Sequence, residues 1–334
     1  MSYSYSIAPA SAASRARGSH SAFAFAIAIG CLWNGATAQA QSLSDRADRP
    51  PLRDALDTKT STEKTADKDI TIGLDIPVRF SSSVTNPNLD AIVEDRPDRH
   101  ITPEVYLRWA HQYDWFKVSA EIGASIDRYF RTSDANLDSL HGSFKFAKTD
   151  GKKEYFVPYF SLSHDMFFLP TFSQPDITYD DVTVGFYSAL AWRDKTLIPY
   201  QDALINYSDA SEPGDMSILF DARFGRRMSD TASFQHTFVS GRITATYYIS
   251  NNWRIEANSA LRARWYENYH GERRTDWRPS AAIGLIWTPE WLTKLVKRSE
   301  LSFNVEYYRN QSNIPDKSYK LWEIGPTLSL RTKF

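Results

Sequence analysis

The chain has 334 residues, and its 39 Lys and Arg against 40 Asp and Glu give a net charge of -1. This balance lacks the basic excess of nucleic-acid-binding proteins, so no nucleic-acid partner is expected. Mean hydropathy is -0.46, which excludes a protein built from long apolar membrane helices. Aromatic residues make up 14% of the chain, which is typical of strands with one apolar face.

Residues 1–40 are predicted to be a cleavable secretory signal. Arg15 and Arg17 precede an uncharged apolar segment at 21–33, and Ala38-Gln39-Ala40 matches a small-residue cleavage site. The alternatives are a membrane anchor helix and a lipid-modified Cys31. Because Cys31 is the only cysteine, the processed chain would have no thiol for a disulfide, for catalysis or for zinc binding.

Two further regions follow the predicted signal. Residues 41–67 are polar and have almost no apolar periodicity, so a disordered periplasmic leader is expected there. Residues 68–334 alternate between apolar and polar side chains, which predicts strands with one face of each kind. The predicted strands cover 70–80, 105–109, 116–126, 140–146, 156–162, 182–192, 218–224, 243–249, 253–265, 277–287, 301–307 and 324–334.

The fold predicted from this pattern is all-β, a transmembrane antiparallel up-and-down β-barrel of 12 strands. Many of the alternating segments have about the length that a tilted strand needs to cross a bilayer, roughly 9–11 residues. A soluble sandwich typically has shorter strands, of about 5–6 residues. The connection at 194–215 contains further apolar residues and could add two strands, so 14 strands is the alternative.

The lengths of the connections predict the orientation. Short turns at 112–114, 149–151 and 251–252 are expected at the periplasmic end, and longer loops outside. The connection near 229–231 is a short outer exception, and 194–215 is a long inner one. The longer outer loops are predicted at 81–100, 131–139, 166–180, 266–276 and 311–320.

One helix is predicted among the connections. Thr288-Pro289-Glu290 is typical of a helix start, with a capping residue, a first-turn proline and an acidic residue. Trp291, Leu292, Leu295 and Val296 would form an apolar face, so a short amphipathic helix is expected at the periplasmic membrane surface. A plain basic turn is the alternative.

Tryptophans stand at the ends of two consecutive predicted strands. Trp253 and Trp265 bracket the first, and Trp277 and Trp287 bracket the second. At about 3.3 Å per residue and a tilt near 40°, each pair spans roughly 25–30 Å along the membrane normal. This is the height of an apolar band with an aromatic girdle at each rim, so the four tryptophans are predicted membrane-girdle residues. Ordinary cross-strand aromatic packing is the alternative.

The last alternating segment runs from Ile324 to Phe334 and ends on an aromatic residue. With this terminal strand the chain resembles the porin-like β-barrels of the Gram-negative outer membrane. The resemblance covers roughly residues 68–334. No specific substrate family is matched. The resemblance implies an outer-membrane location after Sec-type export, contact with outer-membrane lipid, and recognition of Phe334 as an assembly signal by the barrel assembly machinery.

If the apolar faces meet lipid, the polar faces line the lumen, and the C-terminal strands carry most of its arginines. A one-sided basic wall in a low-dielectric barrel favours anions, and tyrosines along it could stack on sugars. The predicted pore-lining basic residues are Arg223, Arg227, Arg242, Arg254, Arg262, Arg264, Arg278 and Arg331. The predicted pore-lining aromatic residues are Tyr106, Tyr187, Tyr248, Tyr266 and Tyr308.

The function predicted is therefore an outer-membrane porin-like channel for small, anionic solutes. An Arg–Glu network that braces or plugs a structural or assembly barrel is the first alternative. An outer-membrane lipid hydrolase of phospholipase type is the second, because His141 and Ser143 stand two residues apart on one segment. Phe144-Lys145 follows instead of that family's Asn-Gly, so catalysis is not favoured. No cofactor, metal ligand cluster or phosphate loop is expected.

Overall fold

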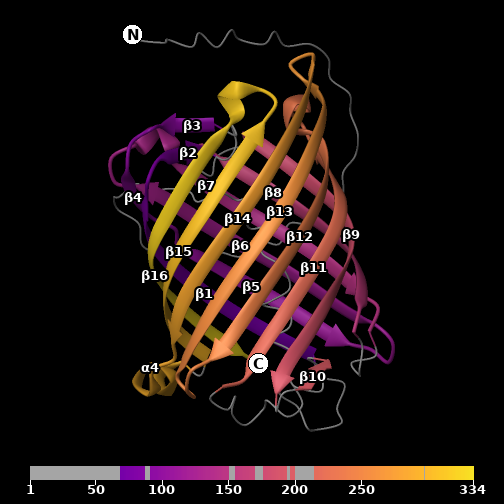
Figure 1. Cartoon of the computed structure of the whole chain (residues 1–334), viewed down its shortest axis with the longest axis vertical. Coiled ribbons are helices and arrows are strands. Elements are labelled where there is room, and N and C mark those ends of the chain that lie inside the picture. The colour runs from indigo at the N-terminus through magenta and orange to yellow at the C-terminus, as the bar shows by residue number, and fades with distance from the viewer. Residues whose placement is uncertain are drawn as a thin grey trace, which may run out of the picture. The chain divides into compact units, whose positions relative to one another are not determined.

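The computed structural model describes residues 68–86, 91–149, 155–169, 176–193, 196–199, 214–296 and 298–334. These residues form a closed antiparallel β-barrel of 12 strands with one short helix (Figure 1), so the strand number predicted from alternation is confirmed. The barrel strands are β1 (Lys68–Ser81), β4 (Asp98–Ile101) continued by β5 (Glu104–Gln112), β6 (Lys117–Tyr129), β7 (Leu137–Ala147), β8 (Val157–Phe168), β9 (Ile177–Arg193), β11 (Met216–Ser229), β12 (His236–Tyr248), β13 (Trp253–Tyr269), β14 (Glu272–Trp287), β15 (Arg298–Ser312) and β16 (Tyr319–Lys333).

The barrel closes where the first strand, β1, pairs with the last strand, β16. Each other barrel strand pairs with its neighbours in chain order. β4 and β5 share one position, since both pair with β1 and β6 in one register and only Thr102 and Pro103 separate them. At the far end of the seam, Phe334 N–H donates to Ile70 O at 2.8 Å. The described chain therefore enters and leaves the barrel at the same end, beside α4 (Glu290–Leu295) in Figure 1.

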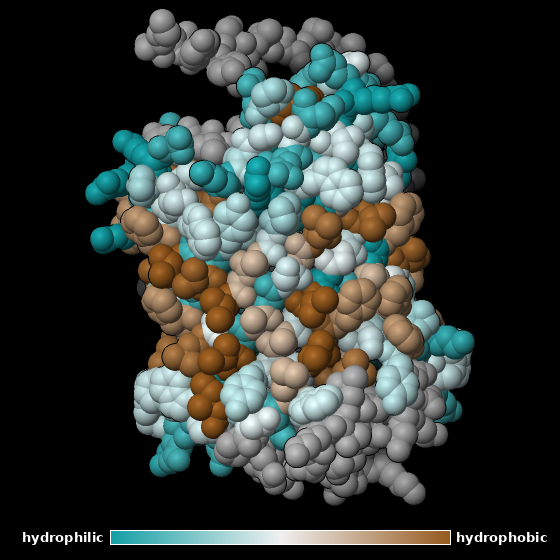
Figure 2. All heavy atoms as spheres, in the orientation of Figure 1, coloured by the Kyte–Doolittle hydropathy of each residue, from teal (hydrophilic) through white to brown (hydrophobic). Residues whose placement is uncertain are grey.

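Alternation along the strands sorts side chains into an apolar outer face and a polar inner face. On β13, Arg262 and Arg264 are each 2% exposed, whereas Leu261 just before them and Trp265 just after them are 48% and 40% exposed. The buried charged side chains thus point into the barrel and the exposed apolar ones away from it. Figure 2 shows apolar residues gathered across the middle of one outer face, with hydrophilic residues above them.

The connection predicted at 266–276 is not a loop. β13 continues to Tyr269 and β14 starts at Glu272, so His270 and Gly271 alone make the turn. Both have positive φ, 51° and 87°, as a two-residue turn that matches strand twist requires. The prediction failed because this hairpin extends beyond the apolar belt, where outward residues are polar and the alternation in hydropathy disappears.

The other predicted outer connections also hold regular structure. The 81–100 connection contains the small hairpin of β2 (Val84–Asn86) and β3 (Ala91–Glu94) and then β4. Short 3-10 helices cap three others: η1 (Ser133–Ala135), η2 (Ala232–Phe234) and η3 (Pro315–Lys317). Within 194–215 the structure describes β10 (Thr196–Pro199), which pairs with the end of β9. The predicted signal, the predicted leader, and most of 194–215 and 149–151 lie outside the described residues.

The predicted helix is present but shorter than its sequence pattern indicates. It covers six residues, its N-cap is Pro289 rather than Thr288, and its C-cap is Val296, which was expected within the helix. Leu292 is buried, while Trp291 and Leu295 are exposed. Among the described residues, no helix is long and apolar enough to cross a membrane.

Candidate functional site

The barrel interior carries the charged residues that the sequence pattern placed there. All eight predicted pore-lining arginines stand at positions whose neighbours along the strand face outward. Arg227, Arg262 and Arg264 are buried, and the other five are half-buried. This wall belongs chiefly to β11, β12, β13 and β14, which pair side by side.

Several of these arginines have carboxylate partners on other strands. Arg227 donates to Asp181 on β9 through Nε at 2.8 Å and Nη2 at 2.6 Å. Arg254 donates to Glu300 on β15 at 2.8 Å, and Arg331 lies 3.9 Å from Asp75 on β1. The ion pairs join strands far apart in sequence, so part of the basic wall braces the barrel as well as facing its interior.

Aromatic rings support the same wall. The guanidinium of Arg262 lies 3.9 Å from the ring centroid of Phe238 on β12, and that of Arg274 lies 4.5 Å from the ring of Tyr266. Stacking of this kind holds a guanidinium in place while leaving its edge for hydrogen bonds. One face of Tyr266 is thereby covered by an arginine of the protein itself.

The five predicted aromatic lining residues share the inward register but differ in access. Tyr106, Tyr248 and Tyr266 are buried, and Tyr187 and Tyr308 are half-buried. Tyr308 donates to Glu306. Tyr187 and Tyr308 therefore offer more accessible ring surface to a solute than the three buried tyrosines do.

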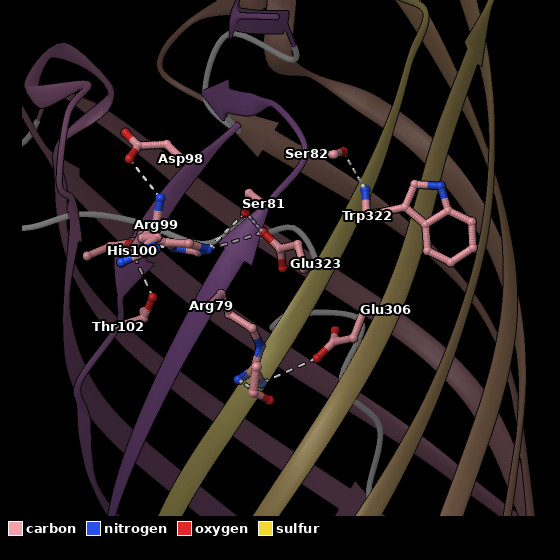
Figure 3. A network of polar contacts seen from close by, with 12 residues as sticks. Arg79, Ser81, Ser82, Asp98, Arg99, His100, Thr102, Glu306, Trp322 and Glu323 are labelled. Atoms are coloured by element: carbon pink, nitrogen blue, oxygen red, sulfur yellow. Dashed lines mark hydrogen bonds and ion pairs between the residues drawn. The ribbon is translucent and has the colours of Figure 1, made fainter. Parts of the chain in front are cut away.

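A polar network lies at the seam where the barrel closes (Figure 3). The ring of His100 on β4 faces two carboxylates: its Nδ1 lies 3.1 Å from Asp127 on β6, and its Nε2 lies 3.3 Å from Glu323 on β16. Ser81 on β1 donates to Glu323 at 2.8 Å, and Thr102 donates to Asp127 at 3.1 Å. The network thus ties four strands together on both sides of the seam.

Arg79 spans a gap in the hydrogen-bond ladder of the same seam. Register pairs join β1 to β16 on either side of Val78 and Arg79 but not at them, since Pro326 opposite has no N–H. The Arg79 guanidinium instead donates to Pro326 O at 2.9 Å and to Thr327 Oγ1 at 2.9 Å. Its Nη2 also donates to Glu306 at 3.4 Å (Figure 3). The side chain thus links β1 to β16 where the main-chain ladder is interrupted.

The opposite wall contains small and acidic residues. His141 on β7 lies 3.5 Å from Glu121 and 3.8 Å from Glu104. Two residues further along β7, Ser143 has the same inward register, pairs with Ser163 on β8, and is exposed to solvent. Water therefore reaches the interior at Ser143, where side chains on both strands are small.

Sequence reasoning missed His100 of the seam network and the Arg274–Asp276 pair. Arg274 donates to Asp276 through Nε at 2.9 Å, inside the hairpin that was expected to be a loop. His100 likewise fell within the predicted 81–100 loop. Both sites could have been found from the period-two register. If the alternation is continued past the end of the apolar pattern, His100 and Arg274 fall on the inner face of the barrel wall.

The predicted girdle residues all lie on the outer face. Trp253 and Trp287 are cross-strand partners near α4, while Trp265 and Trp277 are exposed further along the same two strands. Phe334 follows the last strand and is 69% exposed. Contact of these residues with lipid, and recognition of Phe334 during assembly, stay predictions.

A closed barrel with an apolar outer belt and a charged interior defines a transmembrane β-barrel of the outer-membrane class. Among the described residues, no group of His, Cys, Asp and Glu has the arrangement of a metal site. No family model matches the chain, and no curated protein matches it.

Solved structures resemble the chain in fold. The translocator domain of autotransporter NalP from Neisseria meningitidis is 9% identical with a TM-score of 0.40, covering 87% of this chain and 96% of that one. The KdgM porin in complex with disordered oligogalacturonate is 10% identical, with a TM-score of 0.36 and coverages of 76% and 97%. The NanC porin is 12% identical, with a TM-score of 0.38 and coverages of 76% and 98%. These likenesses assign neither a function nor a solute to this chain.

Proposed function

We propose that the chain is an outer-membrane, porin-like channel for small anionic solutes. The observation that carries the proposal is the charge of one inner wall. On β11 to β14 the inward register holds four carboxylates, those of Asp221, Glu256, Asp276 and, beside the turn, Glu272. The same positions hold eight arginines: Arg223, Arg227, Arg242, Arg254, Arg262, Arg264, Arg274 and Arg278.

Such a wall attracts anions because it is enclosed in a low-dielectric barrel, where the field of its charges is focused into the lumen. Its effect on a passing ion does not need direct contact, so a stacked arginine such as Arg262 still contributes to the potential. The charges of Arg227 and Arg254 are largely offset by Asp181 on β9 and Glu300 on β15. The half-buried members, among them Arg242 and Arg278, are the ones that a solute would touch.

Solvent access to the interior supports a channel over a plugged barrel. Ser143 is exposed although it faces inward, and its neighbours Ser161 and Ser163 on β8 are half-buried. On the other side of the barrel, Ala260, Ser280 and Ala282 are small, inward and half-buried. Small residues on both walls leave room that an interior filled by long side chains would not have.

The lipid hydrolase alternative gains no support from its candidate pair. A serine nucleophile needs its base within hydrogen-bond reach. The structure records no hydrogen bond between the described side chains of His141 and Ser143, and His141 is instead close to two carboxylates.

Ion selectivity in planar bilayers tests the proposal. The folded protein is expected to form pores whose reversal potential in a salt gradient shows preference for chloride over potassium. Replacing Arg262 and Arg264 together by Gln, or Arg242 alone, should move the permeability ratio toward unity. Arg226→Gln, which removes an outward-facing arginine, is the matched control and should leave it unchanged.

Two outcomes would overturn the proposal. A protein that is folded by circular dichroism but conducts no current would favour the structural, plugged barrel. Release of fatty acid from phospholipid, abolished by Ser143→Ala, would establish the enzyme instead. Oligogalacturonate, which is held by the KdgM porin, is a suitable larger anion for testing whether solutes block the current.

A further inference from the structure

Two positive side chains face each other on the outer surface of the barrel. Arg309 on β15 and Lys320 on β16 are direct cross-strand partners, and both are exposed. The next outward pair on the same strands is Tyr307 and Trp322, which confirms that Arg309 and Lys320 point away from the lumen. Like charges placed directly opposite each other destabilise a strand pair. A bound anionic group would remove this repulsion.

No such group is present among the described residues. Neither cation lies within ion-pair distance of a described carboxylate. The side-chain amide of Gln311, oriented to accept, lies 2.8 Å from Arg309 Nη2 and carries no charge. A contrasting case on the same surface is Arg226, which is paired with Glu267 at 3.2 Å. The Arg309–Lys320 pair is therefore a site of uncompensated positive charge.

The residues beneath the pair run from polar to apolar toward the middle of the barrel. The rings of Tyr307 and Trp322 lie 4.7 Å apart by their centroids, and Trp322 is 53% exposed. The next outward pair is Val305 and Ile324, both apolar. This order matches the layers of a membrane lipid: cations suit its anionic headgroup, aromatic rings suit the interface, and apolar side chains suit its acyl chains.

We propose that Arg309 and Lys320 bind a phosphate group of an anionic lipid in the outer leaflet, with its acyl chains along Trp322 and Ile324. The site lies near η3, at the opposite end of the barrel from α4 and from Phe334. This end faces outward in the orientation expected for a chain whose two ends stay in the periplasm. The proposal rests on the outer-membrane location proposed above and is independent of the solute.

Binding of a defined lipid to the detergent-folded protein tests the site. The probe is bisphosphorylated diglucosamine lipid, compared with the same lipid after removal of its phosphates, and the readout is native mass spectrometry or a fluorescence titration. Replacing Arg309 and Lys320 together by Gln should weaken binding of the phosphorylated lipid by about tenfold or more. Lys320→Arg should retain it.

The control is Arg226→Gln, which removes an outward cation that is already paired with Glu267 and should leave the affinity unchanged. Equal affinity of the double variant and the unaltered protein, with both folded, would overturn the proposal. So would equal binding of the dephosphorylated lipid. Competition by inorganic phosphate at millimolar or lower concentration would indicate a free-phosphate site and reject the lipid. Conductance does not enter this assay, so its outcome is separable from that of the channel.

Discussion

The indole rings of Trp253 on β13 and Trp287 on β14 stack across the strand pair, with centroids 5.4 Å apart and ring planes 8° apart. This contact joins the two strands on the outer face, close to the turn that contains Asn251 and Asn252. Its position makes it both an element of strand pairing and a candidate part of the aromatic girdle.

A double-mutant cycle separates the ring contact from the separate contributions of the two side chains. With Trp253→Ala and Trp287→Ala, the coupling in unfolding free energy is expected to be about 0.5–1.5 kcal/mol. Urea unfolding of the barrel in lipid vesicles measures it. The control cycle joins Trp253→Ala to Trp265→Ala, twelve positions away on the same strand, and should be additive. Zero coupling in the first cycle would show that the stacking does not stabilise the barrel.

The adjacent residues Arg226 and Arg227 provide a comparison of an exposed and a buried ion pair. Arg227 and Asp181 are both buried and joined by two hydrogen bonds. Asp181→Asn should therefore lower the unfolding free energy by about 3–5 kcal/mol, since it leaves a buried guanidinium without its carboxylate. Glu267→Gln, which breaks the exposed pair of Arg226, should cost at most about 1 kcal/mol. Similar losses in the two variants would contradict the difference in burial.

The seam of the barrel depends on a glycine. A Cβ at Gly325 would lie 2.0 Å from the main-chain oxygen of Val78, and this glycine has a φ of +159°. Because main chain cannot move aside as a flexible side chain does, Gly325→Ala should destabilise the barrel by about 1–3 kcal/mol. At Gly241 a Cβ meets nothing within 4 Å, so Gly241→Ala should be neutral or stabilising by up to about 1 kcal/mol. Urea unfolding of the two variants measures both effects. A Gly325→Ala midpoint equal to that of the unaltered protein would contradict the prediction.

Ser143 and Gly142 test whether the interior conducts. Ser143 is inward and exposed, whereas a Cβ on Gly142 points outward into open space. Ser143→Trp is therefore expected to reduce single-channel conductance, because it places an indole in the lumen, and Gly142→Trp to leave it unchanged. A Ser143→Trp barrel that folds and conducts as before would show that ions do not pass this point.

The sequence alone predicted twelve strands, with fourteen as the alternative, and the inward or outward direction of most side chains. Both follow from a period of two, which is a local property of the chain: Arg262 and Leu261 are neighbours and so must face opposite sides. The same reasoning failed at the hairpin around His270 and Gly271. There the outward side chains no longer meet the apolar belt, and the hydropathy pattern carries no register.

Only the tertiary structure decided which charges meet. Asp181 and Arg227 are 46 residues apart, and His100 reaches carboxylates from β6 and β16 only because the sheet closes on itself. Register between distant strands is set by ring closure and by the tilt of the sheet, neither of which leaves a mark in a local pattern. The same holds for Arg309 and Lys320, since their opposition depends on how β15 is aligned with β16.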